Sequence, residues 1–502
     1  MKAAAWTRRD VIRSTVQIAS GLGLAHLSEL AASASSPSHG EESRADDYTF
    51  IVTTEGEAWQ KGSLSKTPFS WDMLNLNIGP EELEQAAKTP QKIDGFGACF
   101  NELGWTSLSR LTDRDRETVL HELFDPDAGA RLTYCRMPIG ANDFARAYYS
   151  YDEVPGDFSL EHFSIANDQD TLIPFIKAAL HFQPELRLWA SPWTPPSWMK
   201  RNGFYAEAKA YPGMKDNGIR PDQVGHEGQD MFFQEPCYLE AYARYFGRFI
   251  DEYKKNDIRV GMVMPQNEFN SAQNFPSCTW TPEGLAHFLE YLIPEMTKRD
   301  VEVFFGTLER GNVNLLKTVL ADEKIASHIK GLGLQWAAKN ALPEIHSLYP
   351  GLRIYQSEQE CGDGTNSWTY SGYCWQLMKA YFRNGARAYM YWNLSTDAGG
   401  KSAWGWAQNS LVTVDPAEKS FRFNHDYYLL KHLTHFVDVG AKYLNTNGTC
   451  DDALGFVNPD GTVVLLVRNE LDTKRLVQVK LKSRTLTLEL PADSIGTLSV
   501  KP

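Results

Sequence analysis

Two glutamates stand where apolar, strand-like runs of the sequence end. Glu268 comes three residues after one such run, and Glu358 comes directly after another. Two carboxyl groups at one cavity can cleave a glycosidic bond, because one protonates the leaving oxygen while the other attacks the anomeric carbon or activates water. Similar runs are followed by Trp193, Asn267 and Trp392, whose indole and amide groups suit a sugar ring. We therefore predict a sugar-cleaving site at these strand ends.

If the chain folds as a β/α barrel, the sequence spacing of the two glutamates indicates where they lie in it. They are 90 residues apart, which is three strand-and-helix units at roughly 30 residues each, so the two strands would lie on opposite walls of one mouth. A separation of about 5 Å between the carboxyl groups predicts retention of the anomeric configuration, and a wider gap that admits water predicts inversion. The number of residues between the two glutamates does not give the distance between their carboxyl groups, so retention and inversion both remain open.

Strand-like and helical stretches alternate along residues 90–430. Strands are expected at 132–138, 187–191, 259–265, 302–306, 331–336, 352–357 and 386–392, and helices at 238–256, 282–299 and 373–384. Most of these strands are apolar on both faces, and no glycine-rich nucleotide motif follows the first one. The pattern predicts an α/β fold, a (β/α)8 TIM barrel, with its reactive groups at the carboxyl ends of the strands.

Short strands with hairpin spacing flank this region. Residues 48–54 and the carboxyl-terminal part are rich in β-branched and aromatic residues, and Pro459-Asp460-Gly461 marks a turn. These patterns predict an antiparallel β-sandwich built from amino- and carboxyl-terminal strands. We expect residues 48–89 to join the sandwich, 90–430 to form the catalytic barrel and 431–502 to complete the sandwich.

The composition excludes several classes of protein. The 502 residues carry 50 Lys and Arg against 63 Asp and Glu, a net charge of −13, which argues against nucleic acid because its phosphates would be repelled. No uncharged apolar run reaches the roughly 18 residues that a membrane span needs. The 12 His and 7 Cys show no full metal-ligand spacing. We expect no metal, no organic cofactor and no membrane span, and the sequence carries no signal for the oligomeric state.

The amino terminus has the pattern of an export signal. Arg8 and Arg9 precede a modest apolar run at 18–27 and a small-residue site at Ala32-Ser33-Ala34, as in a twin-arginine signal peptide. We expect residues 1–34 to be this signal, residues 35–47 to be a flexible linker, and the protein to be bacterial and periplasmic or secreted. An ordinary amphipathic helix with a chance pair of arginines is the alternative.

A series of motifs occurs in order along the chain. They are Ile93-Asp94-Gly95-Phe96-Gly97-Ala98, Cys135-Arg136-Met137-Pro138-Ile139 with Asn142-Asp143-Phe144, Ala190-Ser191-Pro192-Trp193-Thr194-Pro195-Pro196-Ser197-Trp198, Gln266-Asn267-Glu268, Trp280-Thr281-Pro282-Glu283 and Ser357-Glu358. Together they resemble family 30 glycoside hydrolases, the group that includes the lysosomal glucosylceramidases. The resemblance implies a (β/α)8 barrel with a side β-sandwich, and a retaining mechanism without metal or organic cofactor.

The resemblance also implies roles for single residues. Glu268 matches the acid/base and Glu358 the nucleophile, and Asn267 would hydrogen-bond the sugar's 2-hydroxyl group. Arg136 would keep Glu358 ionised, although a purely structural ion pair would use the same geometry. The residues expected to bind substrate are Arg136, Asp143, Trp193, Asn267, Trp336, Trp392 and Asn409.

Three features depart from the family pattern. Glu360 would share the face of Glu358 if the strand continued, so it is an alternative nucleophile. Gln335-Trp336-Ala337 stands where the glucosylceramidases carry a His and a Tyr flanking the Trp, which leaves the sugar and the aglycone pocket open. Asn409 ends a loop at 399–409 that is expected on the aglycone side.

These observations predict a retaining, exo-acting β-glycosidase of the glucosylceramidase or β-glucosidase type, acting on a β-glycoside or oligosaccharide by double displacement. Endo-β-1,6-glucanase, β-fucosidase and β-xylosidase activities are alternatives within the same family. The alternative from another class is a carbohydrate-binding protein without turnover, which would hold glycan on Trp193, Trp198 and Trp392. The presence of both glutamates argues against that alternative.

Overall fold

The structure is a computed structural model that describes residues 48–68, 70 and 73–501. The expected signal peptide at 1–34 and linker at 35–47 lie outside these residues. Within the described part of the chain, no helix combines the length and the apolar character that a membrane span requires.

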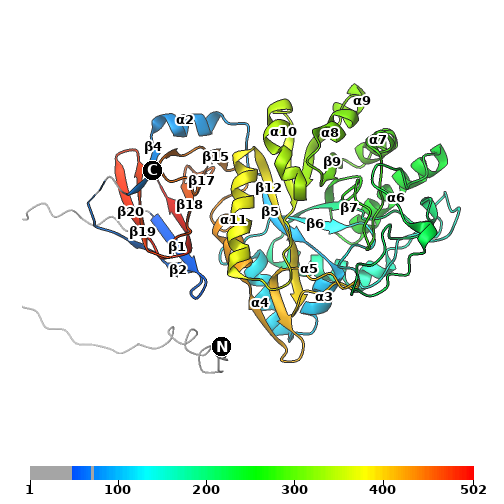
Figure 1. The fold of residues 1–502 in the computed structure, drawn as a ribbon, viewed down its shortest axis with the longest axis horizontal. Helices are drawn as coiled ribbons and strands as arrows, with labels where there is room; N and C mark the ends of the chain where they lie inside the picture. Colours follow the sequence, from blue (N-terminus) through cyan, green and yellow to red (C-terminus); the bar gives the residue numbers. More distant parts are fainter. Residues whose placement is uncertain (1–47, 69, 71–72, 502) are drawn as a thin grey trace, which may run out of the picture. The chain divides into compact units, whose positions relative to one another are not determined.

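Eight parallel strands of the described chain close into a barrel (Figure 1). They pair in the order β11-β10-β9-β8-β7-β6-β5-β12, and β11 pairs with β12 to close the ring. Their bounds are β5 Gly95–Cys99, β6 Tyr134–Pro138, β7 Arg187–Ser191, β8 Val260–Val263, β9 Glu302–Leu308, β10 Ile329–Gln335, β11 Arg353–Glu358 and β12 Ala386–Asp397. The predicted TIM barrel is confirmed, with β5 as a strand that the expected runs did not include.

Helices follow the strands and cover the outside of the barrel (Figure 1). Thr281, Pro282 and Glu283 show why one of them begins where it does: the Thr281 side chain accepts the N–H of Gly284 at 2.9 Å, and proline and glutamate occupy the first turn. The helices are α3 Glu102–Leu108, α4 Asp113–Phe124, α5 Leu172–Phe182, α6 Pro236–Lys255, α7 Pro282–Thr297, α8 Val313–Val319, α9 Glu323–Ala326, α10 Leu342–Leu348, α11 Trp368–Arg383 and α12 His425–Thr434.

Buried side chains from six of the barrel strands, together with Met264 just after β8, pack together inside the barrel. They form one buried cluster, consisting of Tyr134, Trp189, Met262, Met264, Phe304, Tyr355, Ala388 and Met390. A barrel filled in this way is a packed core rather than a channel, so only the carboxyl-terminal mouth is left for a site.

The second domain is a β-sandwich of two sheets. One sheet has the order β15-β17-β18-β21-β1-β2, and the other β16-β4-β19-β20-β3. The amino-terminal strand β1 (Tyr48–Thr54) pairs antiparallel along its whole length with β21 (Ser494–Val500), so both ends of the chain build this domain. The other bounds are β2 Gln60–Lys61, β3 Ser63–Leu64, β4 Leu74–Ile78, β15 Lys442–Leu444, β16 Asn447–Gly448, β17 Ala453–Val457, β18 Val463–Asn469, β19 Arg475–Leu481 and β20 Arg484–Leu490.

Two details differ from the simple antiparallel pattern. Strand β4 pairs with β19 in parallel, and helix α2 (Pro80–Lys88) occupies part of the segment that was expected to contribute strands. Strands β13 (Ser410–Asp415) and β14 (Ser420–Phe423) extend the barrel sheet beyond β12. These additions leave the barrel and the sandwich as predicted.

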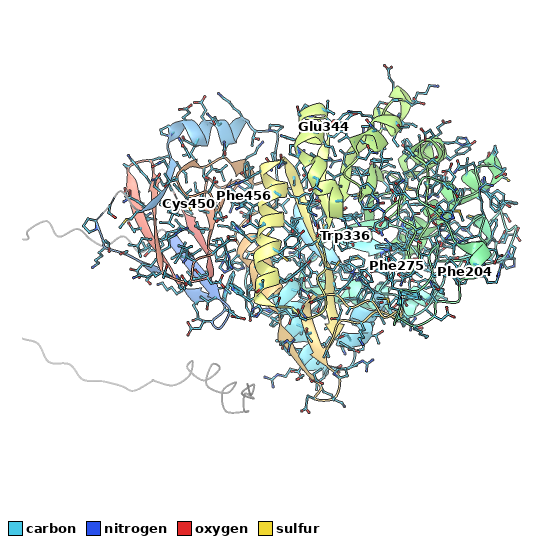
Figure 2. All side chains as sticks on the ribbon, viewed as in Figure 1. Phe204, Phe275, Trp336, Glu344, Cys450 and Phe456 are labelled. Carbon is cyan, nitrogen blue, oxygen red and sulfur yellow. The ribbon has the colours of Figure 1, made fainter. Side chains whose placement is uncertain are left out.

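Helices α11 and α12 pack the sandwich against the barrel. The buried imidazole of His432 lies between the hydroxyl groups of Thr53 and Thr497, each at 2.9 Å. Phe382 of α11 packs against Phe456 of β17 with ring centroids 5.4 Å apart, and Phe456 lies beside α11 in Figure 2. Helix α12 therefore runs across the expected domain boundary at residue 430 and serves both domains.

Candidate active site

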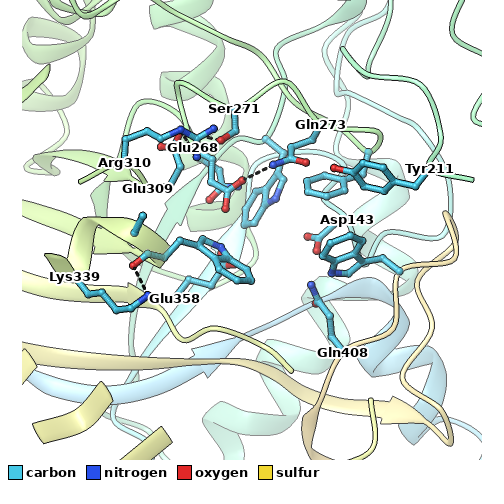
Figure 3. Close-up of a pocket in the computed structure, with 16 residues that line it drawn as sticks. Asp143, Tyr211, Glu268, Ser271, Gln273, Glu309, Arg310, Lys339, Glu358 and Gln408 are labelled. Carbon is cyan, nitrogen blue, oxygen red and sulfur yellow. Dashed lines mark hydrogen bonds and ion pairs between the residues drawn. The ribbon is translucent and has the colours of Figure 1, made fainter. Parts of the chain in front are cut away.

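A cavity of about 420 Å³ opens at the carboxyl ends of the barrel strands (Figure 3). The structure brings most of the predicted site residues together on its lining, namely Asp143, Trp193, Asn267, Glu268, Trp336 and Glu358. Arg136, Trp392 and Asn409 are not part of this lining. The two predicted catalytic carboxyl groups therefore face one common space.

Glu268 follows β8 in an unusual backbone conformation. Its φ angle is +46°, in the left-handed region that non-glycine residues rarely occupy, and such residues cluster at functional sites. Its backbone N–H donates to the hydroxyl of Thr307 at 2.8 Å, and its carboxylate accepts from the amides of Gln335 at 3.2 Å and Gln273 at 3.3 Å. Burial raises the pKa of the Glu268 carboxyl, and the Gln335 hydrogen bond opposes this shift.

Glu358 is the last residue of β11, on the opposite wall of the barrel mouth. Its carboxylate accepts a hydrogen bond from the Arg136 guanidinium at 2.6 Å. Burial raises the pKa of Glu358 to about 7, and the positive charge of Arg136 counteracts that rise. Glu358 is thus a buried carboxyl group with a positively charged hydrogen-bond partner.

Glu360 points to other partners. Strand β11 ends at Glu358, so the alternation that would give both residues one face does not continue. The Glu360 carboxylate instead accepts from Lys339 at 2.6 Å and from the hydroxyl of Tyr373 at 2.7 Å. It is not on the cavity lining.

Arg136 connects the two halves of the site from β6, where it is fully buried. Its second terminal nitrogen donates to the side-chain oxygens of Asn267 at 2.7 Å and Ser191 at 2.9 Å, and its guanidinium lies 4.3 Å from the ring centroid of Trp193. The Asn267 oxygen also accepts from Thr307 at 3.0 Å. With that oxygen occupied, the Asn267 NH₂ group is the part available to donate to a sugar hydroxyl.

Asp143 and Trp193 both belong to the cavity wall, and Asp143 lies across the cavity from Glu268 in Figure 3. Asp143 is 4% exposed, and its Oδ1 has no hydrogen-bond partner in the described chain. Burial and the charges of Glu358 and Glu268 raise the pKa of Asp143 well above its usual range. Trp392 packs against Trp193 with centroids 5.5 Å apart and is only 1% exposed, so it supports the wall from behind.

Asn409 and Trp198 are held by other parts of the protein. The Asn409 side-chain oxygen accepts the backbone N–H groups of Gly364 and Asn366, each at 3.0 Å, which fixes the loop before α11. Its neighbour Gln408 lines the cavity in its place. The Trp198 indole donates to the backbone oxygen of Asp152 at 3.0 Å and lies outside the cavity lining.

Several residues of the cavity were not singled out from the sequence, although Ala337, Trp406 and Gln408 lie in segments that were expected near the aglycone. They lie in the loops after β7, β8, β9, β10 and β12 and comprise Tyr211, Ser271, Gln273, Phe275, Glu309, Arg310, Ala337, Lys339, Trp406 and Gln408. Most of these loops have no periodic pattern from which a position could be predicted. Glu309 is different, because it directly follows β9, and the rule that located Glu358 would have found it had the full length of that strand been recognised.

Comparisons with known proteins identify the same two domains. Residues 93–437 match the glycosyl hydrolase family 30 TIM-barrel domain, and residues 440–498 match the β-sandwich domain of the same family. The chain is 26% identical over 425 residues to the lysosomal acid glucosylceramidase of Mus musculus, covering 79% of this chain and 77% of the relative. It is 26% identical over 435 residues to the endo-1,6-beta-D-glucanase neg1 of Aspergillus fumigatus, covering 81% of this chain and 84% of that relative.

Solved structures share the same architecture. SrfJ from Salmonella typhimurium superimposes with a TM-score of 0.77 at 23% identity, over 91% of this chain and 99% of that chain. The barrel, the sandwich, the paired carboxyl groups and the family matches lead to one conclusion. The chain belongs to glycosyl hydrolase family 30, and it is a glycoside hydrolase that cleaves O-glycosyl bonds with retention of configuration.

Proposed function

We propose that this glycoside hydrolase is an exo-acting β-glycosidase in which Glu358 is the nucleophile and Glu268 the acid/base. The observation that carries the proposal is that both carboxyl groups line one cavity from opposite walls of the barrel mouth. The position of Arg136 supports the division of roles, because it hydrogen-bonds Glu358 at 2.6 Å while the described contacts of Glu268 are with amides.

The ionisation of the pair fits these roles. Two nearby buried carboxyl groups resist being charged together, so the pair retains one proton over a range of pH. Arg136 hydrogen-bonds Glu358 directly, whereas the side-chain partners of Glu268 are uncharged amides, so we infer that Glu358 carries the negative charge and Glu268 the proton. A retaining mechanism begins from this state, with a charged nucleophile and a protonated acid.

The reaction then proceeds in two steps. Glu358 attacks the anomeric carbon while Glu268 gives its proton to the leaving oxygen, so the glycosidic bond breaks as the glycosyl-enzyme ester forms. Glu268, now charged, takes a proton from water, and that water attacks the same carbon and releases Glu358. The Asn267 NH₂ group would donate to the sugar's 2-hydroxyl, a contact that strengthens in the transition state.

The Asp143 end of the cavity supports exo action. Asp143, which is 4% exposed, and Trp193, which packs on Trp392, both line the cavity, and we expect the terminal sugar to rest against them. The free Oδ1 of Asp143 suits a hydroxyl of that sugar, because a buried polar atom without a partner costs about 1–3 kcal/mol. An internal sugar of a long chain would need an opening at this end.

The glycon that best fits these observations is β-linked glucose. The names of the relatives from Mus musculus and Aspergillus fumigatus both refer to glucosyl substrates. The second of these names favours one alternative, endo-β-1,6-glucanase action.

A panel of p-nitrophenyl β-glycosides tests the glycon, and digestion of β-1,6-glucan tests the mode of action. Exo action releases glucose alone at early times, whereas a ladder of oligosaccharides would establish endo action. Release of nitrophenol from none of the panel, at any pH between 4 and 8, would overturn the proposed exo activity, and an additional lack of products from β-1,6-glucan would favour a binding protein without turnover.

We also propose that the protein leaves the bacterial cytoplasm through the twin-arginine route, with residues 1–34 removed. The paired Arg8 and Arg9 and the small residues at 32–34 support this proposal. Amino-terminal sequencing of protein from the periplasm or the medium is the test. An intact Met1 on exported protein would contradict it.

A further inference from the structure

Glu309 is a carboxyl group in the cavity that the proposed mechanism does not use. It follows β9 directly, lines the same cavity as Glu268 and is 1% exposed. Its Oε1 accepts from the hydroxyl of Ser271 at 2.8 Å and from the backbone N–H of Asn270 at 3.2 Å. Its Oε2 is buried and has no hydrogen-bond partner among the described residues. A buried polar atom that lacks a partner at the edge of a substrate cavity calls for a ligand atom.

The place of Glu309 relative to Glu268 indicates which part of the substrate it meets. In Figure 3, Glu309, Arg310 and Ser271 lie with Glu268 on one side of the cavity, and Asp143 lies on the other. An acid that protonates the leaving oxygen must stand beside the leaving group. The Glu309 side of the cavity is therefore the side of the leaving group, if Glu268 has the role proposed above.

The surroundings of Glu309 are polar and charged. Ser271 and Gln273 line this side, and the Arg310 guanidinium is bound to Glu227 at 3.1 Å while lying 3.9 Å from Glu309. A hydrocarbon leaving group in this position would cover these groups without pairing the free oxygen of Glu309. A leaving group with hydroxyls would pair it.

We propose that Glu309 binds a hydroxyl group of the leaving sugar and so selects sugars over lipids as leaving groups. The proposal rests on the proposed function. Burial, followed by the charge of Glu268, raises the pKa of Glu309 to about 8, which makes it a neutral acid below that pH. In this form its Oε2–H can donate to the sugar hydroxyl while Oε1 keeps its bonds to Ser271 and Asn270.

The transfer of glycosyl groups to added acceptors tests this directly, because acceptors enter the site that the leaving group vacates. The enzyme is given p-nitrophenyl β-glucoside together with D-glucose or methanol, and the ratio of transfer to glucose over transfer to methanol is measured. We expect this ratio to fall about 10- to 100-fold in Glu309→Ala, the effect of losing one hydrogen bond to a buried carboxyl group. Both acceptors need the same base, so a general loss of Glu268 function leaves the ratio unchanged.

Two variants control for a purely structural role. Glu309→Gln keeps an oxygen for Ser271 and Asn270 and places an NH₂ donor at the free position, so the ratio should stay within about threefold of the wild type. Ser271→Ala removes one partner of Oε1 but leaves Oε2 in place, so it should lower the ratio less than Glu309→Ala does. An unchanged ratio in Glu309→Ala, or an equal fall in Ser271→Ala, would overturn the proposal.

A comparison of two substrates on the wild-type enzyme tests the same proposal, even if Glu309→Ala does not fold. The β-1,6-linked disaccharide gentiobiose should be cleaved with kcat/KM at least about tenfold above that for octyl β-glucoside. The reverse preference would overturn the proposal. Failure of the wild-type enzyme to release nitrophenol would instead overturn the proposed function, so the two failures are distinguishable.

Discussion

Replacing Arg136 tests whether this residue controls the charge on Glu358 or only holds the barrel mouth together. Arg136 is fully buried and donates to Glu358 at 2.6 Å. Glutamine at this position keeps part of the hydrogen bonding but removes the positive charge. If the charge of Arg136 keeps Glu358 ionised, Arg136→Gln must raise the pKa of Glu358.

The size of the effect follows from the geometry. An opposite charge in direct contact lowers the pKa of a carboxyl group by about 1–3 units, so its removal raises the pKa of Glu358 by about the same amount above its present value of about 7. A nucleophile with a raised pKa needs a higher pH to become charged. The acidic limb of the pH profile should therefore move to higher pH by about 1–3 units, and kcat/KM at pH 6 should fall about 10- to 1,000-fold.

The assay is the pH dependence of kcat/KM on the best p-nitrophenyl β-glycoside, because kcat/KM reports the free enzyme. Arg136→Lys serves as the matched control, since it keeps one positive charge and should move the limb less than Arg136→Gln. Thermal unfolding is recorded in parallel, because breaking a buried ion pair costs about 3–5 kcal/mol. Loss of thermal stability in both variants with no movement of the acidic limb would refute the electrostatic role and leave a structural ion pair.

Three further predictions concern single residues. Glu268→Gln should lower kcat/KM about 10²- to 10⁴-fold for sugar or alkyl leaving groups. For dinitrophenyl glycosides, whose leaving group needs no proton, the loss should be less than about tenfold. An equal loss across a leaving-group series would argue against the acid role of Glu268. Glu360→Gln should change kcat/KM less than about fivefold, because the Glu360 carboxylate is not on the cavity lining and is already paired with Lys339 and Tyr373. A loss comparable to that of Glu358→Gln would restore Glu360 as the nucleophile. Burial lowers the pKa of His432 to about 3 from 6.5. Between these values His432 is neutral in the folded state and protonated in the unfolded state. Its contribution to stability is therefore present above pH 6.5 and declines by up to about 5 kcal/mol as the pH falls to 3. The unfolding midpoint of His432→Gln should accordingly depend less on pH than that of the wild type in this window, and parallel curves would show that His432 is not responsible.

The strand-end rule explains why much of the site could be predicted. Parallel barrel strands are apolar on both faces, so their ends are visible in the sequence, and their carboxyl ends meet at one mouth. Glu268, Glu358 and Trp193 follow such runs, and all three line the cavity. The same rule missed Glu309, because β9 continues to Leu308, beyond the expected end of that run at Gly306.

Residues in long loops escaped prediction for a physical reason. Tyr211 and Gln273 reach the cavity from irregular segments whose paths are set by contacts far away in the sequence. One such contact joins the two loops, where the backbone N–H of Thr279 donates to the buried carboxylate of Glu207 at 3.0 Å. Nothing in the local pattern of a loop shows which side chain will reach the cavity.

Local hydrogen bonds explain two features that hydrophobic patterns do not predict, the structural role of Asn409 and the start of helix α2. Asn409 is polar and lies in the expected loop, but its oxygen is used by two backbone N–H groups of the neighbouring loop. Helix α2 carries start signals that predict it, with Pro80 in its first turn and the Glu82 carboxylate accepting the N–H of Gly79 at 2.8 Å. Pairing partners of this kind, more than residue type, separate structural from functional side chains.

The central claim is that Glu358 bonds to the sugar while Glu268 serves the leaving group and the water. The most direct test is the anomeric configuration of the products that azide forms with two variants, determined by proton nuclear magnetic resonance. In Glu358→Gly, azide replaces the nucleophile and should give the α-glycosyl azide, and in Glu268→Gly it should attack the glycosyl-enzyme and give the β-glycosyl azide. The same configuration from both variants, or no azide product from Glu358→Gly while Glu360→Gly yields the α-glycosyl azide, would contradict the assignment.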